Sequence, residues 1–270
     1  MAATSEYFRA LVKGDMSEAE TKSAELTDIE PDDFVRFLEY AYRGDYTVPS
    51  WALDESAQVA SDAEEAPAVD EEPPPPPEAD GDLLGPPPPE PEPEPVLEGE
   101  ASSWGTPSKK KGKKKREKLT LRMRFQRRSY LTDGAPHALL TEGFQPKSNA
   151  AANQDFAPVF LAHARLYTFA EMRLILPLKE LALHKLHKTL LEFQLYHQRV
   201  GDVVELAQYA YDHGPARSDS GILNDLRQLV VEYMACEVDV IGKHDDFRIL
   251  MEGGGEFVSD FWGIVTRYLL

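Results

Sequence analysis

The sequence predicts an α+β fold in which a small sheet with packed helices is followed by an all-helical C-terminal extension and interrupted by a long disordered insert. Three observations lead to this prediction. Residues 24–49 change from extended to helical patterning. Residues 51–100 hold sixteen acidic residues and thirteen of the chain's 21 prolines. Beyond residue 156, apolar residues recur at the spacing of amphipathic helices.

The first fifty residues carry the most specific local signals. Residues 24–28 predict a short strand, and an acidic turn follows. Pro31 then opens a helix, because its missing N–H would have no partner in a first turn. Gly44 ends the helix, since glycine adopts the left-handed cap conformation without strain. Residues 44–48 predict a second strand. The apolar residues at helical spacing are Ile29, Phe34, Phe37, Leu38 and Ala41.

Several short segments of this sequence resemble parts of a BTB/POZ domain. They are Ser5-Glu6-Tyr7-Phe8 with Leu11, then Ala24–Asp28, then Asp33–Tyr46, and, much further on, Leu161–Tyr167 and Leu178–Ala182, which resemble the pair of closing helices. The layout is most similar to the BTB-domain proteins of filamentous fungi. The resemblance implies a protein-interaction module that is not an enzyme and needs no cofactor.

Two departures from the family pattern qualify that resemblance. A complete BTB domain begins with a hairpin and a helix, and neither lies between Met1 and the matched words. We therefore expect an N-terminally incomplete BTB fold or a truncated gene model, and self-association stays open. Cullin-binding members place an acidic residue two positions after the helix aromatic. Here Phe34 is followed by Arg36, which argues against cullin binding.

The charge of the chain is concentrated in one segment. The whole sequence has a net charge of −18, and residues 51–100 contain no Lys or Arg to balance their acids. Residues 101–130 are basic, with twelve Lys or Arg and one Glu. Many like charges with few bulky apolar residues cannot bury enough surface to offset chain entropy. We therefore predict a disordered insert over residues 51–153, whose proline runs serve as spacer or as ligand of a proline-binding groove.

A basic cluster within the insert is a candidate nuclear localisation signal. Its cations are Lys109, Lys110, Lys111, Lys113, Lys114, Lys115, Arg116 and Lys118. A flexible run of cations can lie along an acidic receptor groove, although it can equally be a solvated basic tract. Phe125 and Tyr130 beside it could stack on bases, but no recognised nucleic-acid fold surrounds them, so we expect no nucleic-acid binding.

The C-terminal part reads as helical throughout. Residues 4–50 and 154–195 are predicted to close on each other as one BTB-like module, and residues 200–270 to form the extension. Asp202 is the expected cap of a helix in that extension. The expected inward stripes are Leu178, Leu181, Ala182, Leu186, Leu190 and Phe193; Val203, Leu206, Ala207 and Ala210; Leu223, Leu226, Val230, Tyr233 and Met234; and Phe257, Phe261, Val265 and Leu269.

Catalytic and metal chemistry find little support. Cys236 is the only cysteine, which excludes an internal disulfide and suggests a reducing compartment. Its apolar helix predicts a buried, inert thiol. His184, His187 and His197 lack a partner at ligand spacing, so we expect an exposed basic helix face and no metal. No signal core follows Met1 and no apolar run could span a bilayer. The expected location is intracellular, nuclear or cytoplasmic.

The function predicted from the sequence is protein–protein interaction as a scaffold or adaptor, without catalysis. Its partners would be other proteins, with a second copy and a cullin as candidates. Two alternatives remain, a substrate adaptor of a cullin ubiquitin ligase and a nuclear chromatin-associated factor. The hypothetical contact residues are Phe34, Phe37, Tyr40, Tyr42 and Tyr46. Their helical spacing is also that of core residues.

Overall fold

A computed structural model describes residues 5–54 except 15, 16, 22 and 24, together with residues 120–131, 144–215 and 221–268. These residues all belong to one compact unit. Most of the predicted insert lies outside the described residues. The candidate localisation signal at Lys109–Lys118 and the proline runs also lie outside them.

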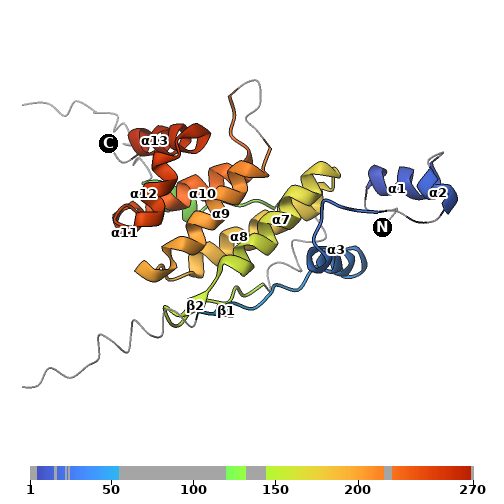
Figure 1. Cartoon of the computed structure of the whole chain (residues 1–270), viewed down its shortest axis with the longest axis horizontal. Coiled ribbons are helices and arrows are strands. Elements are labelled where there is room, and N and C mark those ends of the chain that lie inside the picture. Colours follow the sequence, from blue (N-terminus) through green and yellow to red (C-terminus); the bar gives the residue numbers. More distant parts are fainter. Residues whose placement is uncertain are drawn as a thin grey trace, which may run out of the picture. The chain divides into compact units, whose positions relative to one another are not determined.

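The described part is mostly helical (Figure 1). Its elements are α1 (Glu6–Lys13), α2 (Ser17–Thr21), α3 (Pro31–Arg43), β1 (Ala52–Leu53), α5 (Leu121–Gln126), β2 (Gln154–Asp155), α7 (Ala157–Met172), α8 (Leu176–Glu192), the 3-10 turn η1 (His197–Arg199), α9 (Val200–Asp212), α10 (Asp225–Cys236), α11 (Val238–Ile241), α12 (Asp245–Glu252) and α13 (Gly255–Tyr268).

The sheet is small and antiparallel, which agrees with an α+β fold at a coarse level. Ala52 of β1 lies opposite Asp155 of β2, and Leu53 lies opposite Gln154. The strands predicted at residues 24–28 and 44–48 are wrong where the structure describes them. Around Tyr46, side chains provide the hydrogen bonds to the backbone that a neighbouring strand would otherwise make. The Tyr46 carbonyl accepts a hydrogen bond from Lys185 Nζ at 2.9 Å, and the Tyr46 amide donates one to the Asp45 side chain.

α7 and α8 form the centre of the described core and lie side by side (Figure 1). α7 is buried on nearly every side, as expected of a helix that other elements surround. The stripe predicted along residues 178–193 is buried and confirmed. Pro177 lies in the first turn of α8, where its missing N–H leaves no intrahelical bond unmade. Between the two helices Leu174 has a φ of 54°, a left-handed conformation that is uncommon for a bulky residue.

The N-terminal block packs on α7 through aromatic side chains. Phe37 of α3 lies 5.1 Å, centroid to centroid, from Phe169 of α7 and 5.1 Å from Phe8 of α1. All three rings are buried. α1 and α3 therefore contact α7, which lies more than a hundred residues further along the chain.

The prediction of disorder over residues 51–153 is wrong for the described residues 51–54, which include β1, and for 120–131 and 144–153. Thr120 caps α5 by accepting a hydrogen bond from the Met123 amide, and Leu121 and Phe125 are buried. The Phe125 carbonyl accepts a hydrogen bond from His187 Nε2 at 2.8 Å. The prediction failed here because it was based on the many cations of this stretch. Leu121 and Phe125 are four positions apart and therefore share one face of a helix.

The C-terminal helices follow the predicted stripes closely. The predicted inward residues of α9, α10 and α13 are buried where the structure describes them. Leu223, just before α10, is half-buried, and Leu269 lies outside the described residues. The predicted role of Asp202 as a helix cap is wrong, because α9 begins at Val200 and places Asp202 in its first turn. The Asp202 carboxylate instead accepts a hydrogen bond from the Phe156 amide, at the start of α7, at 2.8 Å.

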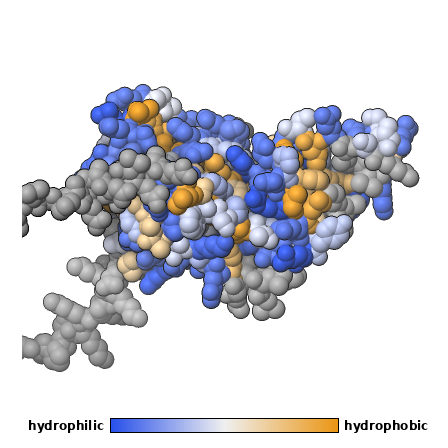
Figure 2. All heavy atoms as spheres, turned by 60° about the horizontal axis from the view of Figure 1, so that its bottom comes forward, coloured by the Kyte–Doolittle hydropathy of each residue, from blue (hydrophilic) through white to orange (hydrophobic). Residues whose placement is uncertain are grey.

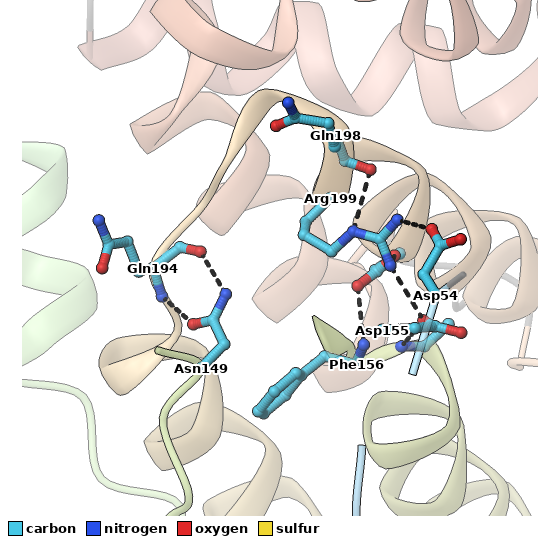
Figure 3. Close-up of polar contacts among 9 residues, drawn as sticks. Asp54, Asn149, Asp155, Phe156, Gln194, Gln198 and Arg199 are labelled. Carbon is cyan, nitrogen blue, oxygen red and sulfur yellow. Dashed lines mark hydrogen bonds and ion pairs between the residues drawn. The ribbon is translucent and has the colours of Figure 1, made fainter. Parts of the chain in front are cut away.

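A buried arginine joins the sheet to the helical region. The guanidinium of Arg199 forms an ion pair with Asp54, next to β1, and contacts Asp155 of β2 (Figure 3). It also lies 3.6 Å from Asp202 of α9. Burial raises the pKa of Asp202 to about 7, and the Phe156 amide and Arg199 oppose that rise. Arg199 thus supplies the positive charge for three carboxylates.

Close by, Asn149 fixes the segment that leads into β2. Its side-chain amide donates to the Gln194 carbonyl at 2.7 Å and its oxygen accepts from the Gln194 amide at 2.7 Å (Figure 3). The chain before β2 is therefore held to the end of α8, beside the Arg199 cluster.

Replacing Arg199 with methionine should lower the free energy of unfolding by about 3 kcal/mol, because the change leaves partly buried carboxylates without a cation. Urea denaturation followed by circular dichroism measures this loss. The matched control is Arg248→Met, whose exposed side chain pairs with Asp245 and Glu252 along one helix and should cost about 0.5 kcal/mol or less. Equal losses in the two variants would contradict the role given to Arg199.

Candidate interaction surface

The structure divides the five predicted contact residues between the core and the surface. Phe37, Tyr40 and Tyr46 are buried, and Phe34 is partly buried against the same core. Tyr42, near the end of α3, is 87% exposed. The helical spacing that suggested a contact face thus marks, for the most part, the side of α3 that packs inward.

A second exposed apolar residue lies on the outer side of α3. Val35 is 54% exposed and precedes Tyr42 by two helical turns, so both side chains lie on one face of the helix. On the side of the molecule shown in Figure 2, hydrophobic residues form separate patches in a mostly hydrophilic surface. Val35 was not predicted as a contact residue, although its position outside the inward stripe of the helix indicates an exposed side chain.

Behind α3, a buried polar cluster joins the Tyr46 segment to α7 and α8. Tyr46 Oη and His163 Nδ1 share a hydrogen bond of 2.7 Å. Lys185 forms an ion pair with Asp45, and its ammonium lies 4.3 Å from the centroid of the Tyr46 ring. His163 and Lys185 are both buried, so the cluster joins these segments within the core.

The surroundings of His163 keep its ring neutral. Burial is the main cause and the nearby Lys185 charge the next, and together they lower the pKa of His163 to about 3. Its Nε2 has no hydrogen-bond partner among the described residues. Burial also lowers the pKa of Lys185, which its hydrogen bond to Asp45 opposes.

A groove of about 530 Å³ lies where the start of α3 meets α7 and α9. Pro49, Pro158 and Leu161 supply apolar lining, and Asp33 and Arg165 supply polar lining. A second groove of about 440 Å³ also includes Asp33 and Arg165, so the two adjoin at these side chains. Asp33 is buried, and this burial raises its pKa although Arg36 and Arg165 act in the opposite direction.

The cysteine and histidines considered for catalytic or metal chemistry lie in different surroundings. Burial raises the pKa of the Cys236 thiol to about 12, which keeps it protonated. His187 is buried and its pKa is lowered to about 4, so the expectation of an exposed basic face is wrong at this position. His197 lies against His244 instead, with ring centroids 4.8 Å apart. In the described part of the chain, no group of three or more ligand-type side chains could hold a metal ion.

Comparison with known families gives one finding. A BTB/POZ domain model matches residues 1–67. The match covers α1, α2, α3 and β1, and therefore the whole outer face of α3. BTB/POZ domains are interaction modules that generally mediate protein–protein contacts, including self-association. No curated protein and no solved structure matches the chain.

The length and hydropathy of a helix decide whether it can cross a membrane. A bilayer core requires about 20 consecutive, mainly apolar residues. No helix within the described ranges meets both the length and the hydropathy that crossing would need.

Stability should fall in acid because of His163. Its pKa is about 3 in the folded chain against an ordinary value of 6.5, so between these values only the unfolded chain takes up the proton. The contribution of the neutral His163 to the free energy of unfolding is fully present above pH 6.5 and is lost as the pH falls below that value. Between about pH 7.5 and pH 5 the loss should be about 2 kcal/mol of unfolding free energy.

The test compares the wild-type chain with His163→Gln, which keeps a polar side chain and does not titrate. Asp202 and His187 titrate in both proteins, so the difference between their unfolding free energies isolates His163. Urea denaturation at the two pH values should show the wild type losing about 2 kcal/mol more than the variant. Parallel pH profiles would show that His163 is accessible to protons in the folded chain.

Proposed function

We propose that this chain is a BTB-type scaffold or adaptor, which binds other proteins and catalyses no reaction. The observation that supports it is the BTB/POZ match over a segment whose central helix, α3, is anchored on one side and exposed on the other. Phe37 fixes the inner side against α7. Val35 and Tyr42 then form an apolar outer face on a rigid support.

The chemistry of that outer face suits a protein partner. Tyrosine offers a large contact area with few rotatable bonds and a polar tip, and it is enriched at the energetic centres of interfaces. Tyr42 is the most exposed of the large hydrophobic side chains described, and the exposed Arg43 adjoins it. Arginine is likewise enriched at interfaces.

The module in this proposal comprises residues 4–50 and 154–195, with residues 200–270 as a helical extension and the insert between the two parts. The aromatic contacts between α1, α3 and α7 support such a division, and so does the hydrogen bond between Tyr46 and His163. The expected likeness to the BTB proteins of filamentous fungi, with an incomplete N-terminal part, belongs to the same proposal.

Two finer versions of the function have separate tests. One version is an adaptor for a cullin ligase, which requires that a cullin co-purifies with the chain. Arg36, which pairs with Asp33 at 2.7 Å, occupies the position where cullin-binding members carry an acid and argues against this version. A nuclear chromatin-associated role depends on Lys109–Lys118. A fluorescent fusion that stays cytoplasmic with that cluster intact would remove its main support.

Replacing Val35 and Tyr42 together by alanine should remove protein partners while leaving the fold intact. Both side chains are exposed, so the unfolding free energy should change by about 0.5 kcal/mol or less. Partners purified with the tagged wild-type chain should bind the double variant about 30-fold more weakly, a loss of about 2 kcal/mol. Quantitative affinity purification followed by binding measurements on the purified pair checks both values.

The matched control replaces Ile249 and Trp262, two exposed apolar residues of α12 and α13, by alanine. This variant should keep the partners of the wild type. Partner loss in the control together with retention in the α3 variant would place the interaction surface on the C-terminal helices and overturn the role of α3.

A further inference from the structure

The two grooves at the start of α3 form one continuous depression, because they share Glu30, Asp33 and Arg165. We call it the α3–α7 groove. It runs past the first turn of α3, along α7, and reaches α9 at Glu205 and Tyr209. It lies apart from the outer face of α3, which carries Val35 and Tyr42 and does not line it.

The lining of the α3–α7 groove is predominantly acidic. Glu30, Asp32 and Glu205 are exposed side chains that form no ion pair with any residue in the described part of the chain. The two lining arginines, Arg36 and Arg165, both interact with Asp33. The charge left over is therefore negative, which favours a cationic ligand and disfavours phosphate or an anionic membrane.

Asp33 provides an independent sign of a missing ligand. Its side chain is 2% exposed, and Oδ1 accepts a hydrogen bond from Arg36 Nη1 at 2.7 Å. Oδ2 is buried and has no hydrogen-bond donor among the described residues. Arg165 Nη1 lies 3.7 Å from Oδ2, beyond hydrogen-bond distance. A buried carboxylate oxygen without a donor is unfavourable, so a donor supplied from outside would be stabilised there.

Arg165 gives such a donor a way in. Its side chain is 42% exposed and lines both parts of the groove, so little packing holds it in one rotamer. Pro49, Pro158 and Leu161 lie in the same lining. Their apolar surfaces suit the methylene stem of a lysine or arginine, whose charged head would extend beyond them.

We infer that the α3–α7 groove binds an extended segment of a partner protein that carries lysine or arginine side chains. One cation donates to Asp33 Oδ2 as Arg165 turns aside, and neighbouring cations pair with Glu30, Asp32 and Glu205. A metal ion does not fit the observations, since no described group of ligand-type side chains could hold one. The inference rests on the proposed function, because it names the chemistry of one class of partner.

The test uses a short fluorescein-labelled peptide in which lysine alternates with alanine, and the full-length chain. Fluorescence anisotropy measures the dissociation constant at low and at physiological salt. The triple variant Glu30→Gln, Asp32→Asn and Glu205→Gln changes only exposed residues and should fold normally. It should bind the peptide about tenfold more weakly, as expected for the loss of three surface ion pairs.

A matched control is needed because the acidic residues at 51–100 could attract any lysine peptide. The control replaces Glu90, Glu92 and Glu94 by glutamine, which removes the same charge from that segment. It should change the dissociation constant less than about twofold at physiological salt, where distant charges are screened. Equal weakening in the two triple variants, or none in the groove variant, would overturn the inference.

A second measurement separates specific seating from general attraction. A photo-reactive group placed beside the central lysine should cross-link to α3, α7 or α9 in the wild type, and this product should decrease in Asp33→Asn. Cross-links confined to residues 51–100 would overturn the inference. If the lysine peptide fails while partner binding still depends on Val35 and Tyr42, this inference falls and the proposed function stands.

Discussion

The packing of Phe37 against Phe169 is the contact on which the N-terminal half of the described fold depends. α3 buries its inner stripe against α7, and Phe8 of α1 stacks on Phe37 and also contacts Phe169. Arg173, at the end of α7, adds an ion pair to Asp28 and contacts the ring of Tyr7. The segment matched by the BTB/POZ model thus shares its core with helices that lie far outside the match. The outer face of α3 and the α3–α7 groove both take their geometry from this contact.

Buried polar side chains hydrogen-bond backbone carbonyls here, as neighbouring strands do in the larger sheets of many α+β folds. Lys185 satisfies the Tyr46 carbonyl, and His187 satisfies the Phe125 carbonyl. Lys185 thereby joins the irregular segment at Tyr46 to the α7–α8 pair, and His187 joins α5 to it. The chain can therefore remain extended near Tyr46 without a strand partner. The histidines stay neutral because burial disfavours their charged forms. This dependence on neutral side chains makes the packing sensitive to acid.

Helices and their inward faces could be predicted from the sequence because the spacing of apolar residues follows directly from the helical repeat. The stripes of α8, α9 and α13 are examples. Other features depend on contacts that spacing does not contain. The strand pairing is set by residues far apart in the chain, and α5 was hidden by the cations around Leu121 and Phe125. For the candidate surface, helical spacing does separate the buried Phe37 from the exposed Tyr42, since the two lie five positions and about 140° apart around the helix. Spacing alone does not tell which exposed residues contact a partner.

The Arg199 cluster has a consequence for the order in which the protein is built during translation. Asp54 precedes Arg199 by 145 positions, so the ribosome delivers the carboxylate long before its cation. At common rates of synthesis the interval is on the order of ten seconds. For most of that interval, until α7 is made, the N-terminal segment also lacks the helix that covers Phe37. A nascent chain at that stage exposes apolar rings, which favours aggregation.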